Sequence, residues 1–344
     1  MRRRAPQCHR KSFLPRLGLF AGVALLSAQG VCAQTLAPKV MVVTMFAPEA
    51  APWRAAEDFT VQVDVPGLSP RYPQVSCTTG GLCLVTTDMG LANAASSLTA
   101  LVQSGRFDLR QTYFLIAGIG GVDPADGTLG SAHWARYAID GGLLHAVDPR
   151  QRPAGWSSNG AKAPGEKSAW KTGTELFRLD ETLLQKAYTL SAQVPLEDSD
   201  AARAYRLRYP QAAGHGAPRV SICDTLTSDT YWHGTRIAEQ MAAYVSLTTD
   251  GQGNYCTTQM EDNATLAALK RGADAGLLQF NRIALLRTAS NFDREAPGQD
   301  VGTSLSAKSG GFLPSTHNAY RVGHALTADI LSHWDVWSNG VPKD

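Results

Sequence analysis

Short apolar runs of strand length alternate with helical patterns along most of the chain, and this alternation most constrains its fold. Residues 39–44 (KVMVVT) and 82–87 (LCLVTT) are typical of buried strands, and an Ala- and Leu-rich helical pattern follows at 91–104. A third apolar run at 112–117 ends in the glycine-rich residues 118–124, which we interpret as a turn. The order of strand, glycine turn, helix and strand predicts parallel α/β architecture.

The second half of the chain continues this pattern. We expect strands at 133–139, 219–226 and 282–288, and helices at 175–193, 234–244, 262–275 and 315–337. Residues 149–171 lack periodicity and are rich in Gly, Pro, Ser and Lys, so we expect an exposed insertion there.

The first 33 residues have the pattern of a cleavable secretory signal. A basic leader precedes a short apolar stretch at 17–31 and the small-residue end Val31-Cys32-Ala33. We therefore expect cleavage after Ala33 and a periplasmic or secreted mature protein. The alternative is a retained anchor, but this stretch of about 15 residues is short for a membrane span, and no later run reaches the length of one.

The remaining residues, 34–344, have a length that fits one large α/β domain or two small ones. The net charge of the whole chain is +2, and much of the positive charge lies in the leader. Because there is no basic patch, a nucleic acid polymer is not an expected partner.

Four cysteines follow the predicted signal: Cys77, Cys83, Cys223 and Cys256. An oxidising compartment permits disulfides, and four cysteines allow three pairings. Residues 78–82 (TTGGL) predict a tight hairpin that favours a Cys77–Cys83 bond, which leaves Cys223 with Cys256. The alternative is four separate buried thiols. No C-x-x-C pair indicates a metal site, and we expect no metal.

Polar residues and glycines directly after the predicted strands are the candidates for a site, because parallel α/β sheets bind ligands at the carboxyl ends of their strands. They are Glu49, Thr87, Asp88, residues 118–121, residues 228–232, Met260, Glu261, Arg287, Ser290 and Asn291. Each alone has an ordinary structural explanation, such as a carboxylate at a helix start for Glu261. Their joint order along the chain carries the information.

That order resembles the nucleoside phosphorylase and nucleosidase superfamily, and more closely the purine nucleoside permease family. The segments that carry the resemblance are KVMVVTMFAPEAAPW, TTDMGLANAA, YFLIAGIGGVDP, LGSAHWARYAIDGGL, TSDTYWHG, TTQMEDNATL and LLRTASNFDR. The resemblance implies a single domain of three layers, with a central mixed, mostly parallel twisted sheet flanked by helices. It implies no cofactor and purine nucleosides as ligands. Superfamily members assemble as dimers, trimers or hexamers, so a homo-oligomer is compatible with it and the oligomeric state stays open.

The resemblance also implies roles for individual residues. Met260 and Glu261 match the Met-Glu pair whose carboxylate accepts hydrogen bonds from the ribose hydroxyls. Tyr231 and Trp232 match side chains that pack against the base and the sugar. Glu49 matches the glutamate that activates water in nucleosidases.

Four further positions complete the implied site. Arg287 and Thr87 match residues that hold the water or, in phosphorylases, a phosphate, and Gly118 is a candidate for the wall of the substrate site. Asn291 stands where many members have an aspartate that protonates the purine N7, and where some members that act on 6-oxopurines have asparagine.

Two departures from the superfamily bear on the reaction. Ile116 and Ile119 stand near positions where hexameric phosphorylases have an arginine and a serine, so phosphate lacks those donors. Asn291 can hydrogen-bond a base but cannot protonate it. Asp293 is an alternative donor, although it lies more than one residue length further from the base.

Cleavage of an N-glycosidic bond develops positive charge on the ribose and negative charge on the base. Glu261 is a suitable group for stabilising the ribose and Asn291 for stabilising the base, and Glu49 is suitable for activating water. Three functions therefore remain open. The first is a purine nucleoside hydrolase, with a phosphorylase as its variant. The second is a non-catalytic nucleoside-binding protein that serves uptake with a membrane transport partner. The third is an exported domain with an unrelated ligand.

Three histidines, His133, His145 and His233, have no position in the resemblance. His233 follows residues 231–232 closely enough to reach the 5′ side of a sugar, and a surface role is equally compatible with the sequence.

Overall fold

A computed structural model describes residues 35–343 except 146, 149, 152–165 and 168–170. The predicted signal segment lies outside the described residues, as does most of the predicted insertion at 149–171, whose few described residues are exposed. Residues 34–344 form one compact unit. In the described part of the chain, no helix is both long and apolar enough to cross a membrane.

The centre of the molecule is a mixed sheet with parallel strands in the middle. β1 (Val40–Thr44) lies between β4 (Leu82–Thr86) and β5 (Tyr113–Val122) and is parallel to both, and β12 (Ile283–Phe292) is parallel to β5. At the edge, β2 (Val61–Asp64) and β3 (Gln74–Cys77) run antiparallel. The glycine-rich turn expected after residue 117 is wrong, because residues 118–122 stay paired with β12 and extend β5.

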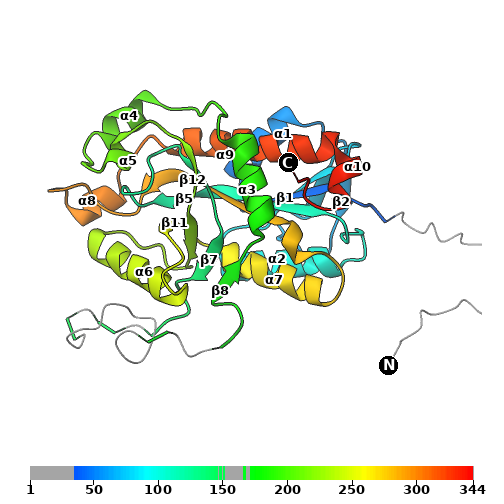
Figure 1. Ribbon diagram of the computed structural model, residues 1–344, viewed down its shortest axis with the longest axis horizontal. Helices are drawn as coiled ribbons and strands as arrows, with labels where there is room; N and C mark the ends of the chain where they lie inside the picture. The colour runs from blue at the N-terminus through cyan, green and yellow to red at the C-terminus, as the bar shows by residue number, and fades with distance from the viewer. Residues whose placement is uncertain (1–34, 146, 149, 152–165, 168–170, 344) are drawn as a thin grey trace, which may run out of the picture. The chain divides into compact units, whose positions relative to one another are not determined.

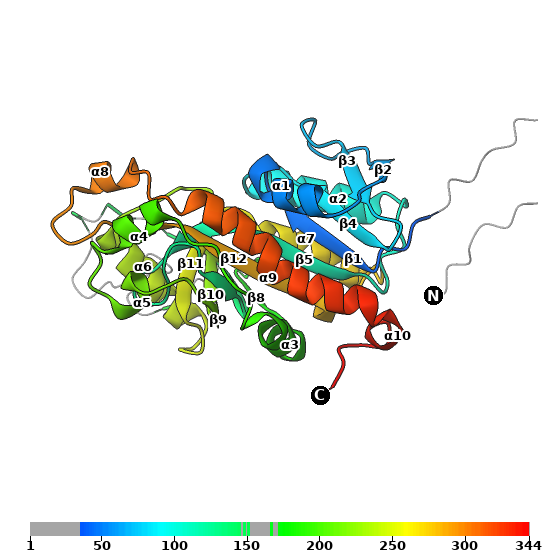
Figure 2. The ribbon, with the colours of Figure 1, turned by 90° about the horizontal axis from the view of Figure 1, so that it is seen from above.

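Successive side chains of the central strands face two different helical layers. Met41 and Val43 pack into one buried cluster with α2 and α7, while Val40 and Val42 pack into another with α1, α3 and α9. Each buried aliphatic side chain contributes about 1.5–3 kcal/mol, so both faces of the sheet need a cover. Figure 1 shows α1 and α9 on one side of the strands and α2 and α7 on the other, and Figure 2 shows the same elements from above. The helices are α1 (Ala47–Ala56), α2 (Leu91–Gln103), α3 (Glu181–Ser191), α7 (Asp262–Asp274) and α9 (Phe312–Ser332). The three-layer α/β fold implied by the sequence is confirmed.

Beyond the centre, the far ends of β5 and β12 belong to a ring of strands that pairings and one chain connection complete. β12 pairs with β6, β6 with β9, β10 with β11, and β11 with β5, while Cys223 links β9 directly to β10. β7 and β8 extend the sheet beside β10. These strands are β6 (Ala132–Trp134), β7 (Tyr137–Asp140), β8 (Leu176–Arg178), β9 (Val220–Ile222), β10 (Asp224–Thr227) and β11 (Tyr255–Gln259).

Two expected strands, 133–139 and 219–226, are each broken in two. The cause lies at Asp224, whose carboxylate Oδ1 accepts hydrogen bonds from the backbone N–H groups of Arg136 (3.1 Å) and Tyr137 (2.8 Å). A side chain thus binds these backbone N–H groups at the break. Before the break, β6 pairs with β12, and after it, β7 pairs with β10.

The remaining helices lie mostly around the ring. They are α4 (Asp200–Arg206), α5 (Ala212–His215), α6 (Thr235–Thr248), α8 (Val301–Leu305), α10 (Trp334–Trp337) and a 3₁₀ turn at Phe280–Arg282. The helix expected at 175–193 begins only at Glu181, because Asp180 caps it by accepting from the Leu183 N–H (2.9 Å). The helix expected at 315–337 is interrupted at His333.

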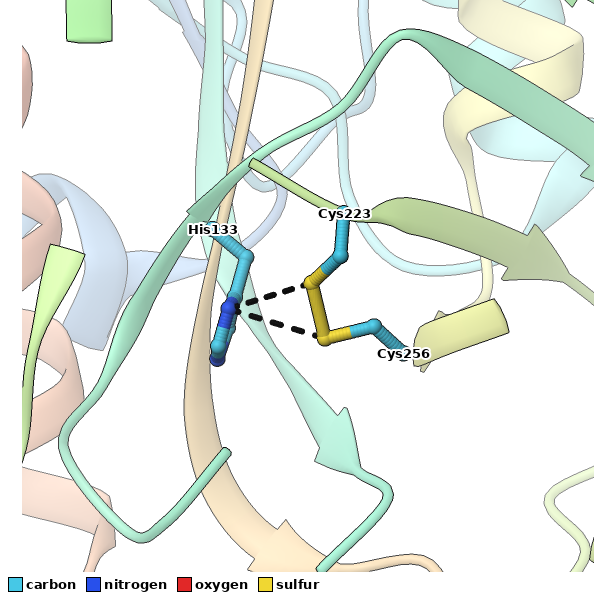
Figure 3. Close-up of side chains that lie close together, drawn as sticks. All are labelled: His133, Cys223 and Cys256. Carbon is cyan, nitrogen blue, oxygen red and sulfur yellow. Dashed lines mark hydrogen bonds between the residues drawn. A yellow bond between two sulfur atoms is a disulfide. The ribbon is translucent and has the colours of Figure 1, made fainter. Parts of the chain in front are cut away.

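Both disulfide pairings favoured by the sequence are present, Cys77–Cys83 and Cys223–Cys256. The second lies against His133, whose Nδ1 is 3.2 Å from the Cys223 sulfur and 3.5 Å from the Cys256 sulfur (Figure 3). These three groups are close enough for a shared metal ion. Because the two sulfurs are bonded to each other, they offer no thiolate, and we assign this cluster to the ring's core.

Candidate active site

A cavity of about 210 Å³ lies where the carboxyl ends of β1, β5, β10, β11 and β12 meet. Seven of the nine residues to which the resemblance gives a role line it, although they come from distant parts of the chain: Glu49, Tyr231, Trp232, Met260, Glu261, Arg287 and Asn291. Thr87 and Gly118 are not among the lining residues. The structure therefore brings most of the predicted set around one cavity.

Glu49 is a buried carboxylate with a fixed orientation. The short helix α1 begins at Ala47, with Pro48 and Glu49 in its first turn. Oε2 accepts from the Met45 N–H and Oε1 from the Ile119 N–H, both at 2.7 Å. Burial raises the pKa of Glu49 to about 7, against the opposing charge of Arg287. Near neutral pH, Glu49 can therefore both accept and release a proton.

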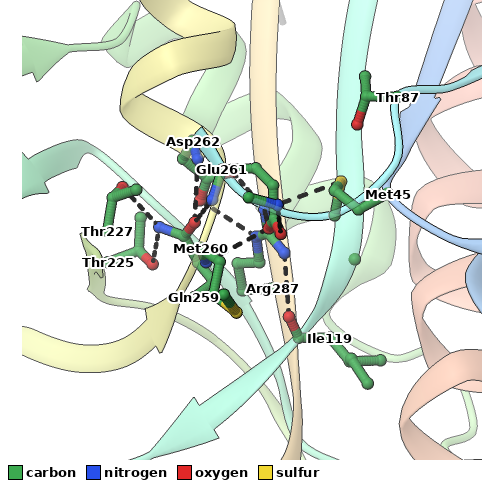
Figure 4. Close-up of polar contacts among 12 residues, drawn as sticks. Met45, Thr87, Ile119, Thr225, Thr227, Gln259, Met260, Glu261, Asp262 and Arg287 are labelled. Atoms are coloured by element: carbon green, nitrogen blue, oxygen red, sulfur yellow. Dashed lines mark hydrogen bonds and ion pairs between the residues drawn. The ribbon is translucent and has the colours of Figure 1, made fainter. Parts of the chain in front are cut away.

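Arg287 lies at the floor of the cavity and is 1 % exposed. It binds Asp262 with two nitrogens, Nε to Oδ2 at 3.1 Å and Nη2 to Oδ1, and its Nη1 donates to the Ile119 carbonyl at 3.0 Å. Nη2 also lies 3.4 Å from Glu261 Oε2. Burial opposes the charge of Arg287, but Asp262 and Glu261 outweigh it and raise its pKa. Arg287 therefore stays charged and organises the carboxylates around it (Figure 4).

Gly118 explains how Glu49 and Arg287 come so close. A Cβ at this position would lie 2.6 Å from Glu49 Oε1, 2.7 Å from Arg287 Nη1 and 2.0 Å from the Met45 side chain. Any larger residue would push these groups apart. Gly118 thus acts on the site by its lack of a side chain and not as part of the cavity wall.

Glu261 lies between the starts of two helices. It directly precedes α7, and its Oε1 accepts from the Gly90 N–H (3.0 Å) at the start of α2. The Gln259 side chain accepts from the N–H groups of Glu261 (2.8 Å) and Asp262 (2.9 Å), so it caps α7 and fixes both acids. Burial raises the pKa of Glu261, and Arg287 opposes this effect.

Asn291 reaches the cavity through a bulge in β12. The pairing with β5 shifts between Ala289 and Asn291, which leaves Ser290 unpaired in the register. Ser290 Oγ donates to Asn291 Oδ1 (2.9 Å), and Asn291 Nδ2 donates to the Phe292 carbonyl (3.0 Å). The Asn291 amide is thus oriented, with one N–H left for a ligand.

The mouth of the cavity is aromatic. Trp232 is 7 % exposed and packs near Tyr255, whereas Tyr231 is 59 % exposed. Phe46 also lines the cavity, and its ring lies near that of Phe312 on α9. Flat apolar side chains of this kind suit a planar ring.

Several other candidates lie outside the cavity. Thr87 is fully buried, donates to the Asp88 carbonyl (2.8 Å), and stands apart from the Arg287 network in Figure 4. His233 pairs with Ser304 of α8 (2.9 Å). His133 lies within the ring described above, and His145 does not line the cavity. Asp293, the alternative proton donor, is bound by Tyr255 and Arg294 and does not line the cavity either.

The sequence pattern that defines the purine nucleoside permease family matches residues 37–342. This chain belongs to that family. A probable purine nucleoside permease of Schizosaccharomyces pombe is 37% identical over 320 residues, covering 88% of this chain and 91% of the relative. A purine nucleoside permease of Candida albicans is 37% identical over 308 residues, covering 87% of this chain and 76% of the relative.

Solved structures that share this fold include nucleosidases. A 5′-methylthioadenosine/S-adenosylhomocysteine nucleosidase of Neisseria meningitidis matches with a TM-score of 0.51 at 13% identity, covering 84% of this chain and 98% of that one. Futalosine hydrolase of Helicobacter pylori matches with a TM-score of 0.54 at 10% identity, covering 85% and 98%. This chain therefore shares the fold of these enzymes.

The site also includes residues that were not predicted from the sequence. Gln259 and Asp262 flank the Met260-Glu261 pair, and Met89 follows β4 directly, so their positions were a usable signal. The role of Asp262 could not be read from spacing, because it depends on contact with Arg287, 25 positions away.

Proposed function

We propose that the cavity binds purine nucleosides and cleaves their N-glycosidic bond with water, in an exported protein that serves nucleoside uptake. The observation that carries this proposal is the pair of buried carboxylates, Glu49 and Glu261, beside one guanidinium at the floor of a cavity with aromatic walls. The family's name supports the nucleoside as ligand, and the likeness to nucleosidases supports the chemistry.

Glu49 is the proposed general base. Each of its oxygens accepts one backbone N–H, which leaves further lone pairs for a water molecule. With a pKa of about 7, a substantial fraction is ionised at neutral pH, and this carboxylate is a stronger base than one of ordinary pKa. The remaining Nη1 N–H of Arg287 would hold the oxygen of that water.

Glu261 is the proposed ribose ligand. Its carboxylate would accept hydrogen bonds from the 2′ and 3′ hydroxyls. Positive charge develops on the ribose as the bond to the base lengthens, and a nearby carboxylate stabilises it. Because Gln259 and the N–H of Gly90 fix Glu261 before the substrate enters, no reorganisation is needed during the reaction.

Asn291 is the proposed partner of the base. Its free N–H would donate to an acceptor of the purine, but an amide cannot transfer a proton at neutral pH. The leaving base would then be stabilised by hydrogen bonding alone, which favours 6-oxopurines because they accommodate negative charge well. Inosine and guanosine are accordingly the first substrates to test.

The second candidate is a protein that binds nucleosides without cleaving them and delivers them to a membrane transport partner. The absence of a proton donor at Asn291 favours it, because Asp293 is bound by Arg294 and Tyr255 away from the cavity. The two candidates predict equal binding and differ only in conversion.

Purified protein incubated with inosine, guanosine and adenosine, with and without phosphate, separates them. We expect free base without added phosphate. Calorimetric binding without any conversion would favour the second candidate, and no binding of any nucleoside would remove both. The export proposal has its own test, because intact mass measurement of the secreted fraction should give a chain that begins at Gln34.

A further inference from the structure

Asp262 contacts the Arg287 that lines the cavity, although Asp262 itself does not line it. It is fully buried at the first position of α7, and its two oxygens take the Nε and Nη2 hydrogens of Arg287. Burial raises the pKa of Asp262, while Arg287 opposes this effect. A buried acid in this position needs a reason beyond packing, because an apolar residue would avoid the cost of its desolvation.

The first consequence concerns the donors of Arg287. Two of its five N–H groups go to Asp262 and one to the Ile119 carbonyl. The second Nη2 hydrogen faces Glu261 (3.4 Å) and the sulfur of Met45 (3.9 Å). Within the described residues this leaves one N–H for a ligand, which suffices for a water molecule. A phosphate is gripped best by the fork of two parallel N–H groups, and here Asp262 occupies that fork.

The second consequence concerns charge. Three carboxyl groups, Glu49, Glu261 and Asp262, surround a single guanidinium, and all of them contribute to its raised pKa. With Asp262 present, the floor of the cavity carries an excess of acidic groups even when Glu49 is protonated. Such a floor repels a phosphate anion and leaves neutral water unaffected.

We propose that Asp262 determines which nucleophile the site accepts. Its carboxylate binds the fork of two N–H groups on Arg287 and neutralises the guanidinium charge, so the site admits water and excludes phosphate. This inference deepens the proposed function and rests on it. In the excluded reaction, a phosphate oxygen would bond to C1′ of the ribose as the bond from C1′ to the base nitrogen breaks. The phosphate's proton would pass to the base, and ribose 1-phosphate would form.

The test is calorimetric titration of the wild-type protein and of Asp262→Asn with inorganic phosphate. Asparagine keeps the size and one acceptor but removes the charge, so we expect phosphate to bind about tenfold more tightly or better. We also expect ribose 1-phosphate to appear with inosine and phosphate. Asp198→Asn is the matched control, because Asp198 binds Arg206 with two hydrogen bonds of 2.8 Å away from the cavity. It should leave phosphate binding unchanged.

Equal phosphate affinity in the wild-type protein and Asp262→Asn would overturn the proposal, as would tight phosphate binding by the wild-type protein. Thermal unfolding checks that the variant is folded, and Asp262→Ser, which also removes the charge, carries the same expectation. Phosphate titration needs no nucleoside, so its outcome is independent of whether the protein cleaves one. Absence of nucleoside binding would instead count against the proposed function.

Discussion

Two buried clusters in this protein have nearly the same composition but different surroundings. In the first, Arg287 binds Asp262 and Glu261; in the second, Arg294 binds Asp293 and Asp123. Beside the first cluster, burial raises the pKa of Glu49 to about 7. Within the second cluster, burial raises the pKa of Asp293 to about 6.

The difference lies in what the raised acid can reach. Glu49 lines a cavity, and among the described residues its carboxylate accepts hydrogen bonds from backbone N–H groups alone. Asp293 is closed in by the Tyr255 hydroxyl (2.7 Å) and by Arg294, and its backbone ties the end of β12 to β5. A perturbed pKa alone therefore does not identify a catalytic group, and access to a ligand decides between chemistry and architecture.

The largest expected contrast is in activity. Glu49→Gln should reduce nucleoside cleavage by about 10²–10⁴-fold, because the general base is lost. Asp293→Asn should leave turnover per folded molecule within a few-fold of wild type. Steady-state assays with inosine measure both. An equal loss of kcat in the two variants would mean that the Arg294 cluster also serves the reaction.

In stability the order should reverse. Asp293→Asn weakens a buried ion pair and should cost about 3 kcal/mol of unfolding free energy. Glu49→Gln keeps one of two backbone hydrogen bonds and should cost about 1–2 kcal/mol. Urea unfolding at neutral pH compares them. If Glu49→Gln proves the more destabilising change, then Glu49 has a structural role that we have underestimated.

Gly118 tests whether the first cluster depends on close approach. Gly118→Ala should cost about 1–3 kcal/mol and most of the activity, because its Cβ would overlap Glu49, Arg287 and Met45. Gly80→Ala is the matched control, since the nearest atom to its Cβ would be 3.7 Å away. Unfolding and activity are measured together. Full activity of Gly118→Ala would show that the cluster tolerates separation.

The last contrast is the pH dependence of stability. The pKa of Glu49 is higher in the folded chain than its ordinary value of 4.5, so the folded chain binds this proton more tightly. The contribution of Glu49 to stability is complete below pH 4.5 and is lost as the pH rises through about 7. Wild type should therefore lose stability relative to Glu49→Gln between about pH 5 and about pH 8. Parallel stability curves for the two proteins would contradict the raised pKa.

Much of the central sheet and the floor of the cavity could be predicted because their signals are local. Strand-length apolar runs marked β1, β4, β5 and β12, and the residues after them, such as Glu49 and Glu261, converge by the geometry of parallel strands. Thr87 satisfied the same rule, yet its hydroxyl turns to the Asp88 carbonyl.

Other features depended on contacts that the sequence does not display. The split of the strand at 133–139 follows from the Asp224 carboxylate, almost ninety positions away. The short edge strands β2 and β3 and the ring strand β11 were missed, because polar residues interrupt them and they form no continuous apolar run like that of β1 or β4. Gly118 was interpreted as a turn because the partner that keeps it extended, β12, follows much later in the chain.

The central claim, that Glu49 activates water for attack on a bound purine nucleoside, is tested most directly with ¹⁸O-labelled water. The protein is incubated with inosine in this water without phosphate, and the ribose product is analysed by mass spectrometry at early times, with Glu49→Gln in parallel. Unlabelled ribose kept in the same water corrects for exchange of its anomeric oxygen. We predict one labelled oxygen on the ribose released by wild type and almost no product from the variant. Unlabelled ribose, product from both proteins alike, or bound inosine that is never cleaved would contradict the account.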